Sequence, residues 1–180
     1  MRELVECVPN FSTSDPETVK EILQAIASVK RVFLLDHSYD DYYNRLVVTV
    51  VGEGQALVQA MLQSAVKAVE LIDMRKHKGQ HPRLGAVDVV PFVPIVKATM
   101  ESCSELAKRF GREFSARCDV PVYLYAESAS SPERRDIDWI REGEFEGLEA
   151  RISRPDRKPD YGPARAHPTA GATITGARKV

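Results

Sequence analysis

The densest group of chemically capable side chains lies in one segment, residues 75–86, which reads RKHKGQHPRLGA. It holds two of the chain's four histidines, His77 and His81, together with four basic residues. A histidine has a pKa near 6.5 in water, so its imidazole can take up a proton and return it, as a general acid–base catalyst must. The alternative is a solvated basic loop with hydrogen-bonded histidines, and spacing alone favours that alternative.

The spacing of His77 and His81 is also that of two metal ligands on one face of a helix. Gly79 and Pro82 disfavour a helix at this place. The segment also holds no cysteine, aspartate or glutamate that would complete a coordination sphere. We therefore expect no metal at this site.

Other charged side chains offer two further kinds of contact. Arg45 and Arg83 are candidates to bind a carboxylate through the guanidinium fork, or else they form surface salt bridges. Asp36, Asp40 and Asp41 form an acidic group that could orient a histidine or bind an amine, or else they belong to a solvated turn. The sequence leaves both pairs of alternatives open.

These residues depend for their positions on the elements around them. Apolar alternation and β-branched residues predict strands at residues 3–8, 32–36, 45–51, 87–95, 121–125 and 171–180. Helical spacing of apolar residues predicts helices at residues 16–29, 54–74 and 100–117, with one or two short helices within 132–148. Polar or proline-rich loops are expected at residues 37–44, 75–85 and 154–168.

The order of the first six elements, βαββαβ, is that of the ferredoxin-like split pattern. We expect an α+β fold: a ferredoxin-like mixed sheet with helices on one face, extended by extra helices and a C-terminal strand. Residues 1–180 are expected to form one domain. Pro91 and Pro94 place strand 87–95 at an edge of the sheet or at a bulge.

The composition narrows the classes of function. The chain has 180 residues and a formal charge of −1, from 25 basic and 26 acidic residues. A nucleic-acid or anionic-membrane surface needs a basic surplus, so we expect neither partner. Three scattered cysteines, a charged N-terminus and short apolar runs predict a cytoplasmic protein without disulfides, signal peptide or membrane span.

Several motifs, in order along the whole chain, resemble one known family, the N-terminal subdomain of formiminotransferase. They are VECVPNFS at 5–12, NR at 44–45, LIDM at 71–74, HKGQHPRLGA at 77–86 with Asp88, PFVP at 91–94, VPVYLY at 120–125, GAT at 171–173 and GARK at 176–179.

The resemblance implies transfer of a formimino group from N-formimino-L-glutamate to tetrahydrofolate, the co-substrate, in histidine degradation. The family's catalytic histidine corresponds to His81. Its folate-binding segment corresponds to Gly162, Pro163, Ala164, Arg165, Ala166, His167, Pro168, Thr169, Ala170 and Gly171. The folate N5 must lose a proton when it attacks the formimino carbon, and the departing glutamate nitrogen must gain one. One histidine within reach of both atoms can act as general base and then as general acid.

Two departures from the family keep alternatives open. Ser38 stands where the family leads us to expect an acidic residue, so Asp40 or Asp41 would have to substitute. The family's second subdomain, whose sheet forms a folate tunnel with the first, is absent from this sequence. An uncovered apolar sheet face is expected to bind a partner, so we expect a homodimer or a separate second subunit. The alternative function is a non-catalytic folate-binding or partner-binding half-module, and a formyl donor would leave the same chemistry for His81.

Overall fold

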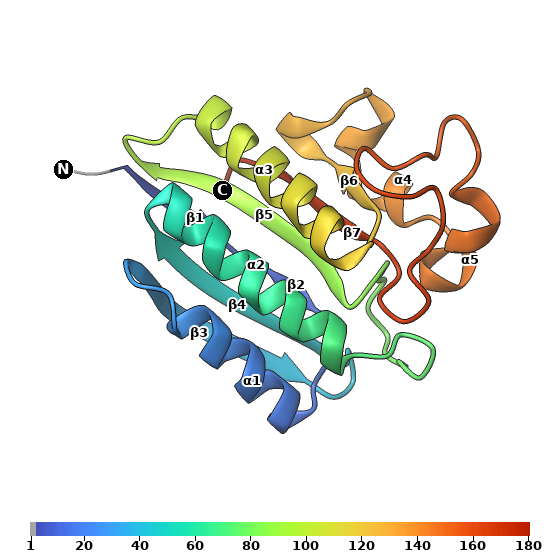
Figure 1. Ribbon diagram of the computed structural model, residues 1–180, viewed down its shortest axis with the longest axis horizontal. Coiled ribbons are helices and arrows are strands. Elements are labelled where there is room, and N and C mark those ends of the chain that lie inside the picture. The colour runs from blue at the N-terminus through green and yellow to red at the C-terminus, as the bar shows by residue number, and fades with distance from the viewer. Residues whose placement is uncertain (1–2) are drawn as a thin grey trace.

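The computed structural model describes residues 3–180, in which a mixed seven-stranded sheet carries three long helices on one face (Figure 1). The strands are β1 (Leu4–Cys7), β2 (Asn10–Phe11), β3 (Val32–Asp40), β4 (Arg45–Gly52), β5 (Val87–Val96), β6 (Val122–Leu124) and β7 (Thr173–Ala177). The α-helices are α1 (Pro16–Ala27), α2 (Gly54–Leu71), α3 (Met100–Cys118), α4 (Ile137–Arg141) and α5 (Glu144–Arg151), and short 3-10 helices lie at Ala126–Ser128 and Glu133–Arg135.

The strand order confirms the α+β class and the mixed sheet. β3 pairs with β4, and β1 and β2 lie end to end between β4 and β5, all antiparallel. β7 then pairs with β5 and β6 pairs with β7, both in parallel. The ferredoxin-like topology itself stays a prediction, because β7 and β6 extend the sheet beyond the six elements that suggested it.

The prediction that strand 87–95 lies at a sheet edge is wrong. β5 lies inside the sheet, between β1 and β2 on one side and β7 on the other. The backbone nitrogens of its prolines carry no hydrogen, so they donate no hydrogen bond. The carbonyl groups can still hold the strand within the sheet, and the Val8 amide donates to Pro91 O at 3.3 Å. The bulge alternative agrees with the register shift between Leu4 and Val5, where Val5 lies opposite Pro94.

β3 is longer than predicted, because residues 37–40 continue the strand rather than forming a loop. His37, Ser38 and Asp40 pair in register with Val48, Val47 and Arg45. Polar residues are tolerated here because β3 is at the rim of the sheet and its side chains are exposed. The turn to β4 is correspondingly short, at residues 41–44.

The two faces of the sheet are covered differently. The helices α1, α2 and α3 bury one face, with Phe11, Leu46 and Phe110 in the shared core. On the other face, a second core joins β5, β6 and β7 to α4 and α5. The part of that face formed by β3 and β4 is open, and Phe33 has 62% of its surface exposed. No helix in residues 3–180 is long and apolar enough to cross a membrane.

Candidate functional site

The loop at residues 75–86 is held against the turn between β3 and β4. The Gln80 amide donates to Tyr42 O at 3.1 Å, and Asn44 Nδ2 donates to Lys78 O at 3.0 Å. At Gly79 an added Cβ would lie 2.2 Å from Tyr43 O, so this close approach of two backbones requires glycine. The loop therefore has a defined path, which places His81 at the open face of the sheet.

His81 lines a cavity of about 230 Å³ at that open face. The other lining residues are Asn10, Ser38, Tyr39, Asp40, Tyr43, Arg45 and Val47. The ring of Tyr43 meets the His81 ring edge-on, with 6.3 Å between centroids. The predicted catalytic histidine thus borders a space that a small ligand can enter.

The tautomer of His81 follows from its backbone contact. Its Nδ1 atom lies 2.6 Å from Pro82 O. A carbonyl oxygen only accepts hydrogen bonds, so Nδ1 carries the hydrogen and donates it. In the neutral ring Nε2 is then unprotonated, and its lone pair is available to a substrate.

Partial burial lowers the pKa of His81 below its ordinary value of 6.5, and the positive charge of Arg45 lowers it further. The hydrogen bond to Pro82 opposes this shift, because a protonated ring also donates. His81 is therefore neutral near pH 7 and can act as a base.

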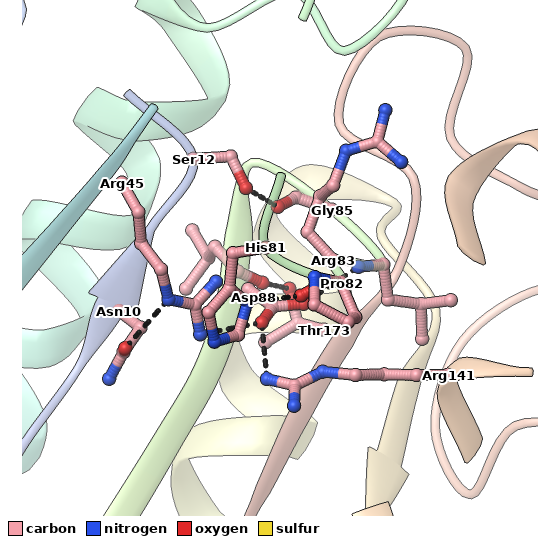
Figure 2. Close-up of polar contacts among 12 residues, drawn as sticks. Asn10, Ser12, Arg45, His81, Pro82, Arg83, Gly85, Asp88, Arg141 and Thr173 are labelled. Carbon is pink, nitrogen blue, oxygen red and sulfur yellow. Dashed lines mark hydrogen bonds and ion pairs between the residues drawn. The ribbon is translucent and has the colours of Figure 1, made fainter. Parts of the chain in front are cut away.

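Behind His81, a buried carboxylate joins two arginines from distant parts of the chain (Figure 2). Asp88 Oδ2 accepts from Arg45 Nη2 at 2.9 Å and from Arg141 Nη2 at 2.5 Å, while Oδ1 accepts from the Leu84 amide at 2.7 Å. In Figure 2 the two guanidinium groups approach Asp88 from opposite sides. Arg45 also donates from Nε to Asn10 Oδ1 at 3.0 Å. This network fixes Arg45 at the wall of the cavity.

The network carries one more positive than negative charge. All three side chains are buried, with 0% of Asp88, 7% of Arg45 and 8% of Arg141 exposed. In addition, Arg141 Nε is buried without a hydrogen-bond partner in the described part of the chain. An uncompensated buried charge is costly, so the site favours an anionic ligand in the neighbouring cavity.

Sequence reasoning identified Arg45 but missed this use of Asp88 and missed Arg141 altogether. The available signal was Asp88 itself, a carboxylate within the apolar run of β5, since such a group is rarely buried without a partner. Arg141 belongs to a short, charged helix and lies 53 residues away, so its sequence carries no such signal.

Arg83 is a structural residue of the loop rather than a free carboxylate-binding group. Its Nη1 and Nη2 atoms donate to Glu146 at 2.8 and 2.6 Å, and its Nε donates to His77 Nδ1 at 3.1 Å. His77 therefore carries its hydrogen on Nε2 and donates it to Asn44 O at 2.9 Å. Partial burial lowers the pKa of His77, which favours the neutral ring. In that ring each nitrogen makes one hydrogen bond that holds the loop.

The acidic group of residues 36–41 separates into different surroundings. Ser38 and Asp40 lie two residues apart on the same face of β3, and both line the His81 cavity. Asp41 lines a different groove, near Ser14 and Lys76. Within residues 3–180, the His81 cavity is lined by Asp40 but by neither Asp36 nor Asp41.

The segment 162–171 joins the loop of His81 through its end. His167 and Gly171 exchange backbone hydrogen bonds at 2.9 and 3.0 Å, which closes a tight turn. The Ala86 amide then donates to Ala170 O at 3.0 Å, five residues after His81. At the other end the exposed Arg165 pairs with Asp119 at 2.5 Å. Within residues 3–180 the segment contributes nothing to the lining of the His81 cavity itself.

Comparisons with known proteins show which family the chain resembles. A family model described as formiminotransferase domain, N-terminal subdomain, matches residues 4–178. The chain is 46% identical over 180 residues to formimidoyltransferase-cyclodeaminase of Rattus norvegicus, covering 99% of the chain and 33% of that protein. It is 44% identical over 179 residues to glutamate formimidoyltransferase of Streptococcus pyogenes serotype M1, covering 99% and 60% respectively.

A third relative is glutamate formimidoyltransferase of Thermoplasma acidophilum, with 46% identity over 178 residues, 97% of the chain and 58% of that protein. The chain thus spans between a third and three fifths of the length of these relatives.

Proposed function

The chain belongs to the family of formiminotransferase N-terminal subdomains, and from that premise we propose that it takes part in formimino transfer from N-formimino-L-glutamate to tetrahydrofolate. The observation that carries this proposal is the partly exposed His81, neutral near pH 7, at a cavity walled by Arg45. Relatives named glutamate formimidoyltransferase support the same class of reaction.

In the proposed reaction His81 moves one proton. The N5 nitrogen of tetrahydrofolate forms a bond to the formimino carbon, and its proton passes to the free Nε2 lone pair of His81. The bond between that carbon and the glutamate nitrogen then breaks, and His81 returns the proton to the departing nitrogen. General acid–base catalysis of this kind contributes a factor of about 10²–10⁴ to the rate.

Two other features take binding roles in this proposal. Arg45, within its positively charged network, suits a substrate carboxylate, because the excess positive charge beside the cavity needs an anion. The segment 162–171 would contact the folate, and its turn at His167–Gly171 is held against the loop of His81 by the hydrogen bond to Ala86.

The open sheet face favours a second candidate, a half-module that works only with a partner. Phe33 of β3 exposes 62% of its surface there. Exposed apolar surface of this kind is typical of an interaction site. We propose that a second polypeptide covers this face, either another copy of the chain or a separate subunit.

An absorbance assay of formimino transfer to tetrahydrofolate, with the molecular mass of the same sample recorded, tests the proposal. We expect turnover. Binding of folate without turnover would contradict transfer by this chain and support the half-module that works only with a partner. A chain that binds neither substrate would contradict both candidates.

A further inference from the structure

The cavity beside His81 contains one residue of each charge in its lining. Asp40, the last residue of β3, supplies the carboxylate, and Arg45, the first residue of β4, supplies the guanidinium. The two are register partners across the short turn, so their side chains start next to each other on the open face.

These neighbours nevertheless do not form an ion pair. Arg45 is directed at Asp88 and Asn10, at 2.9 and 3.0 Å. Asp40 accepts the Tyr43 amide through Oδ1 at 2.9 Å, and none of the ion pairs among residues 3–180 includes its carboxylate. The cavity therefore offers a carboxylate that forms no ion pair with any other described residue.

We propose that Asp40 is the specificity-determining residue that selects a donor whose transferable one-carbon group is cationic, an amidinium rather than a neutral formyl group. This inference rests on the proposed function. A formimino and a formyl group have the same shape, since each has one carbon bound to two heteroatoms. They differ in charge, because an amidine is protonated near neutral pH and an amide is not.

The chemistry of recognition follows from that difference. An amidinium presents parallel N–H donors that match the two oxygens of a carboxylate, as a guanidinium does. A formyl oxygen is an acceptor and finds no donor in the carboxylate of Asp40. Arg45 contributes at the other end of the donor, because its network prefers a carboxylate. The cavity is thus complementary to a molecule that carries both a cation and an anion.

The ordinary alternative is that Asp40 only stabilises the turn through Tyr43. Asp40→Asn separates the two roles, because asparagine keeps the Oδ1 acceptor for the Tyr43 amide and loses only the charge. The matched control is Asp41→Asn, which removes the same charge one residue away, outside the cavity lining.

Calorimetric binding of N-formimino-L-glutamate and of N-formyl-L-glutamate to the three proteins tests the proposal. The wild type and Asp41→Asn should bind the formimino compound more tightly, and added salt should reduce this preference. In Asp40→Asn the preference should fall about tenfold or more, the size expected for losing a hydrogen bond between charged groups.

An unchanged preference in Asp40→Asn would overturn the role of Asp40 and leave the proposed function standing. Equal binding of both compounds by the wild type would also overturn the role of Asp40 and leave the proposed function standing. Binding of neither compound by any of the three proteins would contradict the proposed function as well.

Discussion

The Nδ1 atom of His81 lies 2.6 Å from the carbonyl oxygen of Pro82, its neighbour in the chain. The imidazole is therefore oriented by its own loop backbone. In a catalytic dyad a carboxylate would hold the ring instead and favour its protonated form. Here burial and Arg45 have the opposite effect and lower the pKa. Such a histidine readily gives back a proton that it has taken up, as the proposed reaction requires.

Replacing Asp88 by asparagine should destabilise the fold and disturb the cavity. The substitution leaves Arg45 and Arg141 buried without their shared anion, and breaking a buried pair in this way costs about 3 kcal/mol or more. Urea unfolding followed by circular dichroism measures the loss. Asp73→Asn is the control, because Asp73 pairs with Arg75 at the surface, and we expect little change there. Equal effects of the two substitutions would contradict the importance of the buried network.

Gly79→Ala should displace the loop that carries His81. The new Cβ would lie 2.2 Å from Tyr43 O, so one of the two backbones must move. We expect a loss of about 1–3 kcal/mol in the free energy of unfolding and a shifted imidazole signal of His81 in the NMR spectrum. Gly147→Ala is the matched control. It lies within α5 with its nearest neighbour at 3.6 Å, and it should be neutral or stabilising. A wild-type stability and spectrum for Gly79→Ala would disprove the close approach.

The free energy of unfolding should fall on acidification. The pKa of His77 is lowered in the folded state, mainly by burial. The unfolded chain therefore binds the proton first, so stability is complete above about pH 6.5 and is lost as the pH falls toward the folded-state pKa. His81 and His167, whose pKa values are also lowered by burial, add to the same slope.

His77→Gln checks this assignment, because glutamine keeps one donor and one acceptor without titrating. Denaturant unfolding between pH 5 and pH 7 should show a shallower dependence in this variant. A His77→Gln protein with an unchanged slope would refute the contribution of His77.

The open sheet face should drive association when the chain is the only polypeptide present. Light scattering is then expected to give the mass of two chains, and Phe33→Ser should shift the sample toward one chain because it removes exposed apolar surface from that face. Leu71→Ser is the control, since Leu71 is exposed at the end of α2, on the helical side. A wild type with the mass of one chain would contradict association through the open sheet face.

Much of the fold could be predicted because local signals and tertiary packing agree. Asp15 is the N-cap of helix α1, and Pro16 is its first residue. Helix α3 runs from Met100 to Cys118, within one residue of the range that the apolar pattern predicts. The failures are places where pairing overrides local preference. Strand β3 extends through polar residues to Asp40 because β4 lies beside it, and β5 is central despite Pro91.

The candidate site was predictable only in part, for a physical reason. His81 belongs to a segment whose density of histidines and basic residues is visible over twelve positions. The network of Asp88 is not visible in this way, because its arginines lie 43 and 53 residues away and meet only in the folded chain. Asp40 gained its position from the unpredicted extension of β3.

The most direct test of the account is the rate of formimino transfer from N-formimino-L-glutamate to tetrahydrofolate in the wild type and in His81→Asn. Asparagine keeps a polar group of similar size but cannot carry the proton, so the fold should persist, as circular dichroism would show. We predict that the wild type transfers the group and that His81→Asn loses the activity by a factor of about 10² or more. A folded His81→Asn protein that transfers at the wild-type rate would contradict the account.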